Sequence, residues 1–114
     1  MEIEQYAFGK IVVSGKAYTD DIKIIGDRVV PHRYRFSGHR VEVADVDDVL
    51  AAKPEIFVLG KGEPGRMAAD AELIALLKQE NIELIEKPTK EATAVFNQLF
   101  KKRKNVAAGF HLTC

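Results

Sequence analysis

The 114-residue chain is 46% hydrophobic and 30% charged, which provides apolar material for one core and argues against intrinsic disorder. Its 17 basic side chains balance its 17 acidic ones, so no overall field draws the protein to nucleic acid or to a membrane surface. We therefore expect a single domain, residues 1–114, that binds neither of them.

The cellular compartment is indicated by cysteine content and by the N-terminal residues. The only cysteine is Cys114, which excludes an intramolecular disulfide and favours a reducing environment. The first residues do not resemble a signal peptide or an arginine-rich leader, and no apolar run approaches the roughly 18 residues of a membrane span. We expect a cytoplasmic protein.

The first third of the chain reads as strands. Residues 11–13 and 22–25 are β-branched runs that end in glycine-containing turns, a pattern typical of a hairpin region. Val29 and Val30 continue as a returning strand, and Pro31 predicts that this strand lies on an edge because proline has no amide donor. Residues 32–40, rich in arginine and histidine, are predicted to form a surface loop.

A helical period replaces the strand pattern from Ala44 onward and ends at Lys53-Pro54. The continuous apolar run 56–59 predicts a central strand covered on both faces. A glycine-rich turn follows it, and a second helix with Asp70 as N-cap and Asn81 as its left-handed end residue leads to a strand at 82–85. This order predicts a parallel βαβ crossover.

The last part of the chain adds one helix and one strand. Thr89 is predicted to cap a helix, and residues 106–111 are predicted to be the closing strand. The fold class is therefore α/β, with a mixed sheet, about three helices and an N-terminal β-hairpin region. The buried stripe predicted for this helix consists of Ala92, Val95, Phe96, Leu99 and Phe100.

The glycine-rich turn carries the strongest chemical pattern in the sequence. Gly60, Gly62 and Gly65 match the spacing of a dinucleotide fingerprint. In such a fingerprint the helix begins inside the motif, whereas Asp70 predicts a later start; a start at Pro64 would partly restore the match. We therefore expect no cofactor.

A weaker hypothesis keeps part of this turn as a binding site. The backbone amides near Gly60 and Gly62, together with the cations Lys61 and Arg66, are predicted to form a small concavity for an anion at the end of a central strand. The alternative, which stays open, is that the glycines only permit a tight turn and close packing.

Other residue patterns give weaker evidence for a functional site. His111 and Cys114 resemble a thiol–imidazole pair, but residues three apart on a strand point to opposite faces. The histidines are too dispersed for a metal signature, so no metal is expected. Residues 101–104 form a basic run that suits the last turn of a helix.

A mixture of arginine and aromatic side chains is typical of protein interfaces, and the predicted interaction surface is Arg33, Tyr34, Arg35 and Phe36.

Several separated segments together resemble the small Mth-type domain family, whose members include an adipogenesis-associated protein and a mitochondrial complex I assembly factor. The segments are Phe8 to Val13 with Gly15, Tyr18, Asp21 and Ile22; Gly38-His39; Pro54 to Gly62; Thr89, Ala92, Phe96, Asn97 and Leu99; and Phe110 to Cys114. The resemblance implies a three-layer α/β fold, an intracellular location and no established activity. Gly65 is not part of the family pattern, which argues further against the dinucleotide hypothesis. The N-terminal residues do not resemble a mitochondrial leader, and residues 33–35 depart from tryptophan-containing relatives, so a complex I role is not carried over.

Two functions remain as hypotheses. The first is a non-catalytic cytoplasmic interaction or assembly module with an unidentified protein partner, with self-association left open; no catalytic residues are assigned. The alternative is a small-anion-binding protein or enzyme that uses the glycine turn. Its predicted ligand-binding residues are Gly60, Lys61, Gly62, Arg66 and His39.

Overall fold

The chain begins with a small antiparallel sheet. The computed structural model describes residues 1–31 and 40–113, and in it β1 (Ile3–Ala7), β2 (Lys10–Val13) and β3 (Lys16–Tyr18) pair in the order β1-β2-β3. Ser14 and Gly15 both have positive φ angles, 48° and 81°, as the two-residue turn of a tight hairpin requires. The predicted hairpin region is confirmed, while β1 and β3 were not predicted.

The central sheet has five strands in the order β5-β4-β10-β7-β9. They are β4 (Ile22–Ile25), β5 (Arg28–Pro31), β7 (Ile56–Lys61), β9 (Glu83–Lys87) and β10 (Val106–His111). Strands β7, β9 and β10 are parallel, whereas β4 is antiparallel to both β10 and β5. This is the predicted mixed sheet, with the strand at 56–61 paired on both sides and the strand that ends at Pro31 on an edge.

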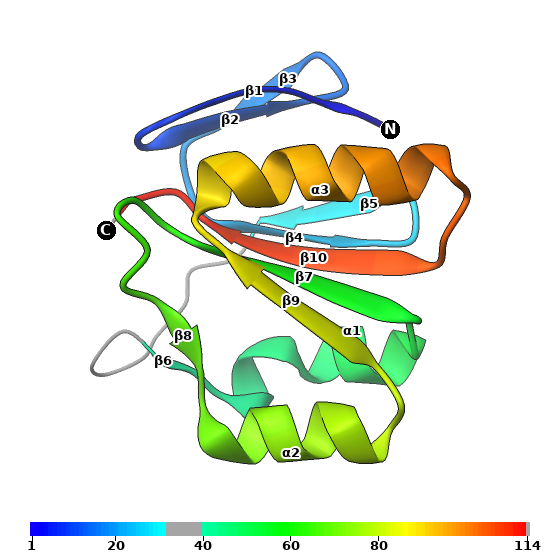
Figure 1. Ribbon diagram of the computed structural model, residues 1–114. Helices are drawn as coiled ribbons and strands as arrows, with labels where there is room; N and C mark the ends of the chain where they lie inside the picture. Colours follow the sequence, from blue (N-terminus) through cyan, green and yellow to red (C-terminus); the bar gives the residue numbers. More distant parts are fainter. Residues whose placement is uncertain (32–39, 114) are drawn as a thin grey trace.

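Helices cover both faces of the central sheet (Figure 1). A 3₁₀ turn (η1, Val43–Val46), α1 (Asp47–Ala52) and α2 (Ala71–Gln79) lie on one face, and α3 (Thr89–Lys101) lies on the other. The crossover through α2 leads outward from β7 to β9, and the crossover through α3 returns to β10. Because parallel crossovers are right-handed, two crossovers that run in opposite directions across the sheet place their helices on opposite faces.

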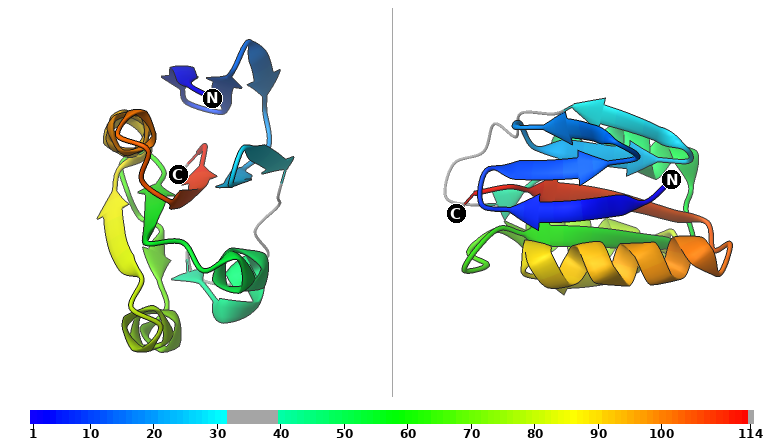
Figure 2. Two further views of the ribbon diagram at one scale, coloured as in Figure 1. Left: turned by 90° about the vertical axis from the view of Figure 1, so that its right-hand side faces the viewer. Right: turned by 90° about the horizontal axis from the view of Figure 1, so that it is seen from above.

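The layers are clear when the molecule is turned (Figure 2): the N-terminal sheet and α3 lie side by side above the central sheet, and α1 and α2 lie below it. Two short parallel strands, β6 (Arg40–Val41) and β8 (Ala68–Ala69), accompany the lower layer. The predicted α/β class with three helices and three layers is therefore confirmed. None of the helices in residues 1–31 and 40–113 is long and apolar enough to cross a membrane.

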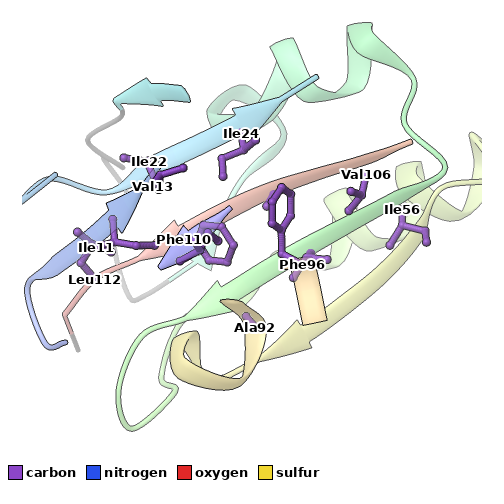
Figure 3. Packing of buried hydrophobic residues seen from close by; sticks show 13 residues of the cluster. Ile11, Val13, Ile22, Ile24, Ile56, Ala92, Phe96, Val106, Phe110 and Leu112 are labelled. Carbon is purple, nitrogen blue, oxygen red and sulfur yellow. The ribbon is translucent and has the colours of Figure 1, made fainter. Parts of the chain in front are cut away.

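Each face of the central sheet has its own apolar core. The upper core joins the N-terminal sheet, the central sheet and α3 (Figure 3), and its Phe96 and Phe110 rings meet edge to face with centroids 6.0 Å apart. Both rings are fully buried, and the burial of Phe96 was predicted from the sequence. The lower core joins Phe57 and Leu59 of β7 to α1 and α2. These two faces define the two sides of the site described below.

Most predicted helix ends are confirmed, and one is wrong. The Asp70 side chain accepts a hydrogen bond from the Glu72 amide at the start of α2, and Asn81 is left-handed with φ 60°. The start of α3 differs from the prediction, because Pro88 occupies the N-cap and Thr89 is the first helical residue. The Thr89 hydroxyl is bonded to other parts of the chain instead.

Candidate functional site

The glycine turn lies at the carboxyl end of β7, and packing explains both of its first two glycines. A Cβ atom on Gly60 would lie 2.8 Å from a ring carbon of Phe110 and 3.0 Å from the Thr89 hydroxyl oxygen. At Gly62, φ is +84°, and a Cβ atom would overlap the carbonyl oxygen of Thr113 and lie 2.8 Å from the His111 ring. Both positions therefore require glycine, because residues at the start of α3 and near the C-terminus occupy the space that a Cβ atom would need.

The turn's polar backbone groups are bonded within the chain. The Gly62 amide donates to the Thr89 hydroxyl (2.8 Å), which in turn donates to the His111 carbonyl (2.6 Å). The Glu63 amide donates to the Thr113 carbonyl (3.1 Å), and the Gly62 carbonyl accepts from the Thr89 amide (3.2 Å). The amides of Gly62 and Glu63 are thus already committed to the protein's own groups.

The helix that a dinucleotide fingerprint places inside the motif begins later. Residues 63–67 run irregularly from the turn to β8, and α2 starts only after its N-cap, Asp70. The helix that follows the turn in the sequence therefore does not begin inside the motif, as a pyrophosphate site requires. The start of α3 lies against the turn instead, and its Thr89 and Lys90 amides donate to the Gly62 carbonyl and the Glu63 carboxylate. The alternative helix start at Pro64 is wrong.

The two cations of the turn lie on a closed loop. The Met67 amide donates to the Lys61 carbonyl (3.1 Å), which brings Arg66 back beside the end of β7. Lys61 is half-buried and Arg66 is exposed, and within residues 1–31 and 40–113 neither side chain forms an ion pair. The anion site stays a prediction, and it now depends on these side chains rather than on the amides.

Five of the predicted site residues lie outside the described part of the chain. They are the interaction-surface residues Arg33, Tyr34, Arg35 and Phe36 and the ligand-binding residue His39.

A pairing that the sequence did not reveal lies beside the turn. His111 Nδ1 is 2.6 Å from Asp21 Oδ2, and the other Asp21 oxygen accepts the Leu112 amide (2.9 Å). Only 15% of the His111 side chain and 13% of the Asp21 side chain are exposed. Because a carboxylate faces Nδ1, that nitrogen carries the hydrogen in the neutral ring, and Nε2 is left as the acceptor.

A tyrosine from the N-terminal sheet completes this region. The Tyr6 hydroxyl and the Gly9 amide both donate to the Leu112 carbonyl, at 2.9 and 2.8 Å. Burial raises the pKa of Tyr6 above its usual value, and the carboxylates of Glu63 and Asp21 add to this shift. Residues 111–113 are therefore held by groups from the N-terminal sheet, from Asp21 just before β4, from the glycine turn and from α3.

The side chains gathered at this edge do not suggest a metal centre. Across the described ranges, 1–31 and 40–113, no three histidine, cysteine, aspartate or glutamate side chains are placed to share a metal ion. The arrangement instead offers one oriented imidazole, one carboxylate and two nearby cations, which suits hydrogen bonding and charge pairing with a small polar ligand.

Comparison with known proteins connects this fold to a sequence family and to solved structures. Residues 3–111 match the family model described as "Protein of unknown function (DUF498/DUF598)". The chain is 28% identical to the conserved hypothetical protein PH1505 from Pyrococcus horikoshii OT3, with a TM-score of 0.85 and full coverage of both chains.

Two more distant structures share the fold. Xanthomonas campestris XCC1710 is 21% identical, with a TM-score of 0.83 over 96% of this chain and 83% of that protein. A Bordetella pertussis protein described as a Mth938-like domain is 14% identical, with a TM-score of 0.65 over 97% of this chain and 85% of that one. The predicted Mth-type resemblance is confirmed at the level of the fold.

Proposed function

Because the chain belongs to the DUF498/DUF598 family, whose description assigns no function, we propose from its own surface that it is a non-catalytic interaction or assembly module of the cytoplasm. The observation that carries this proposal is Phe8, which is 62% exposed at the turn between β1 and β2. The Mth-type resemblance, which includes an assembly factor, supports the same function.

The turn that carries Phe8 is fixed at its base. Gly9, the next residue, donates its amide to Leu112 of the C-terminal strand (2.8 Å), and Ala7 pairs with Lys10 across the hairpin. An aromatic ring on a constrained turn loses little conformational entropy on binding, and buried aromatic rings contribute much of the energy of protein interfaces. Phe8 is therefore suited to be the anchor of a protein contact.

Site-specific photo-crosslinking tests this function. A benzoylphenylalanine at position 8 should give a discrete cross-linked product in an extract of the source organism, and excess unmodified protein should compete it away. The matched control is the same group at Ile74, the other exposed large apolar residue in the described ranges, at 44% exposure. Identical products from both positions, or products that resist competition, would contradict the proposal.

A second function, binding of a small anion, is favoured by the two cations of the glycine turn. Lys61 and Arg66 lie on one closed loop and have no ion-pair partner within the described ranges. Thermal-shift screening against phosphates, nucleotides and carboxylates should give a stabilising ligand whose effect disappears in Lys61→Met/Arg66→Met. The control variant, Lys102→Met/Arg103→Met, removes equal charge from the exposed residues after α3; an equal loss in both variants would refute a specific site.

A further inference from the structure

We propose that Lys61 and His111, with Asp21 as a positioning residue, form a binding site for a small hydroxycarboxylate. The inference rests on the second function above, because it uses Lys61 as the anion partner, but it replaces Arg66 with His111 and places the ligand on one face of the central sheet. It is independent of the contact proposed for Phe8.

Strand register brings the lysine and the histidine together. Lys61 and His111 are direct partners at the carboxyl ends of the parallel strands β7 and β10. Partners on neighbouring strands point to the same face and are separated by about 4.8 Å along the hydrogen-bonding direction. Leu59 lies two residues before Lys61 and Ala107 four residues before His111, so each shares a face of the sheet with the later residue, and both belong to the lower core beneath the sheet. Both side chains therefore lie on the face that carries α1 and α2.

Asp21 determines what His111 presents to a ligand. The carboxylate accepts the Nδ1 hydrogen (2.6 Å), and its second oxygen is occupied by the Leu112 amide. The ring is thereby fixed in one tautomer with a lone pair on Nε2. No group among residues 1–31 and 40–113 donates to Nε2, and a ligand hydroxyl supplies such a donor.

The chemistry of the two groups and their strand register indicate the ligand class. Lys61 favours a carboxylate, since an ammonium group donates charge-assisted hydrogen bonds. Because acceptor and cation come from adjacent strands, one small molecule must carry its hydroxyl and its carboxylate close together. A 2-hydroxycarboxylate meets this requirement, and glycolate is its smallest member.

Glu86 is one of the carboxylates on this face that oppose an anion. It is the partner of Leu59 on β9, and its carboxylate accepts the Ala69 amide (3.0 Å). Asp21 is also negative, but both of its oxygens are hydrogen-bonded. Removing the Glu86 charge should therefore strengthen binding of an anion, and it would not strengthen binding of a cation.

Titration with glycolate and acetate, which differ by one hydroxyl group, tests the inference. We expect protein NMR titrations at fixed ionic strength and fixed pH to show glycolate binding more tightly than acetate. Lys61→Met should weaken glycolate binding roughly tenfold or more, and Glu86→Gln should tighten it. Lys87→Met is the matched control, because Lys87 pairs with Gly60 and so lies on the opposite face of the same sheet edge.

Asp21→Asn tests the positioning role with a readout that stability alone does not change. The amide oxygen can still accept the Leu112 amide, while the amide nitrogen would donate to Nδ1 and move the ring hydrogen to Nε2. The ¹⁵N spectrum of the imidazole should report this tautomer change, and the preference for glycolate over acetate should disappear. If this variant does not fold, the wild-type tautomer and the wild-type preference decide the question.

The outcomes separate this inference from the function on which it rests. Equal binding of glycolate and acetate that depends on Lys61 would keep anion binding and overturn the role of His111. An equal loss in Lys61→Met and Lys87→Met would overturn both. No binding of either anion by the wild type would overturn this inference alone, because the second function is also tested with phosphates and nucleotides. A wild-type His111 with its hydrogen on Nε2 would overturn the proposed ligand class.

Discussion

Substitution of Gly62 by alanine should destabilise the protein by about 3 kcal/mol. The left-handed backbone, with φ +84°, costs an alanine about 1 kcal/mol. The new methyl group overlaps the Thr113 carbonyl and lies 2.8 Å from the His111 ring, so the C-terminal strand must move. That movement breaks the hydrogen bond from Glu63 to Thr113, worth about 1 kcal/mol, and strains the packing by at least about 1 kcal/mol.

Gly15→Ala is the control, because Gly15 has nearly the same φ angle, +81°, and nothing within 4 Å of the added methyl group. It should cost only the backbone term, about 1 kcal/mol. Urea unfolding measures both free energies, and thermal unfolding should show a loss of roughly 10–15 °C for the Gly62 variant. Equal destabilisation by the two substitutions would refute the conclusion that the C-terminal strand makes Gly62 necessary.

Three further predictions concern polar groups that are bonded within the fold. Thr89→Val should lower the unfolding free energy by about 2 kcal/mol, because the Gly62 amide and the His111 carbonyl lose the hydroxyl that joins them. Thr89→Ser keeps the hydroxyl and should lower the unfolding free energy by less than half as much. Equal losses in the two variants would show that the methyl group of Thr89, not its hydroxyl, is responsible. Because burial and two nearby carboxylates raise the Tyr6 pKa above 10.0, its stability contribution is complete below about pH 10 and is lost as pH rises through the folded-state pKa. Tyr6→Phe should therefore flatten the decline in unfolding free energy measured above about pH 10, and an unchanged slope would contradict this. Asp48→Ala should destabilise more than Lys23→Met, because it leaves a 5% exposed ammonium without the carboxylate 2.7 Å away; the reverse order in chemical unfolding would argue against this ion pair as the reason.

Much of the α/β part of the fold could be predicted from the sequence, because its elements have strong local patterns. The apolar run of β7 and the periodicities of α2 and α3 are sufficient to identify these segments. Strands β1 and β3 were missed, because their sequences are polar or short and they are stabilised by pairing with β2. The two-residue strands β6 and β8 depend entirely on a partner distant in the sequence.

The error at Thr89 has a clear physical reason. A threonine at a helix start has the same local pattern whether its hydroxyl caps the helix or bonds elsewhere. Here the proline before it occupies the N-cap, and the hydroxyl bridges the Gly62 amide and the His111 carbonyl. Both partners are more than twenty residues away in the sequence, so no local pattern identifies them.

The candidate site illustrates the same limit. The glycines were identified from their spacing, but the groups that explain them come from the end of the chain. Asp21 and His111 are separated by 90 residues, and only the antiparallel pairing of β4 with β10, in which Phe110 faces Ile22, brings the two side chains into contact. The contact could have been predicted only if these two strands had first been paired.

The same C-terminal residues connect the proposed protein contact to the proposed ligand site. Leu112 holds the turn that presents Phe8, while His111, through its backbone carbonyl and its ring, joins Thr89 and Asp21. A substitution that displaces residues 111–113 should therefore weaken both surfaces. Lys61→Met, by contrast, removes only the ligand's charge partner and leaves these hydrogen bonds in place. The Phe8 cross-link and ligand binding should therefore both be measured in Lys61→Met and in Gly62→Ala. Loss of ligand binding alone indicates a direct binding role, whereas loss of both indicates that the residues supporting both surfaces have moved.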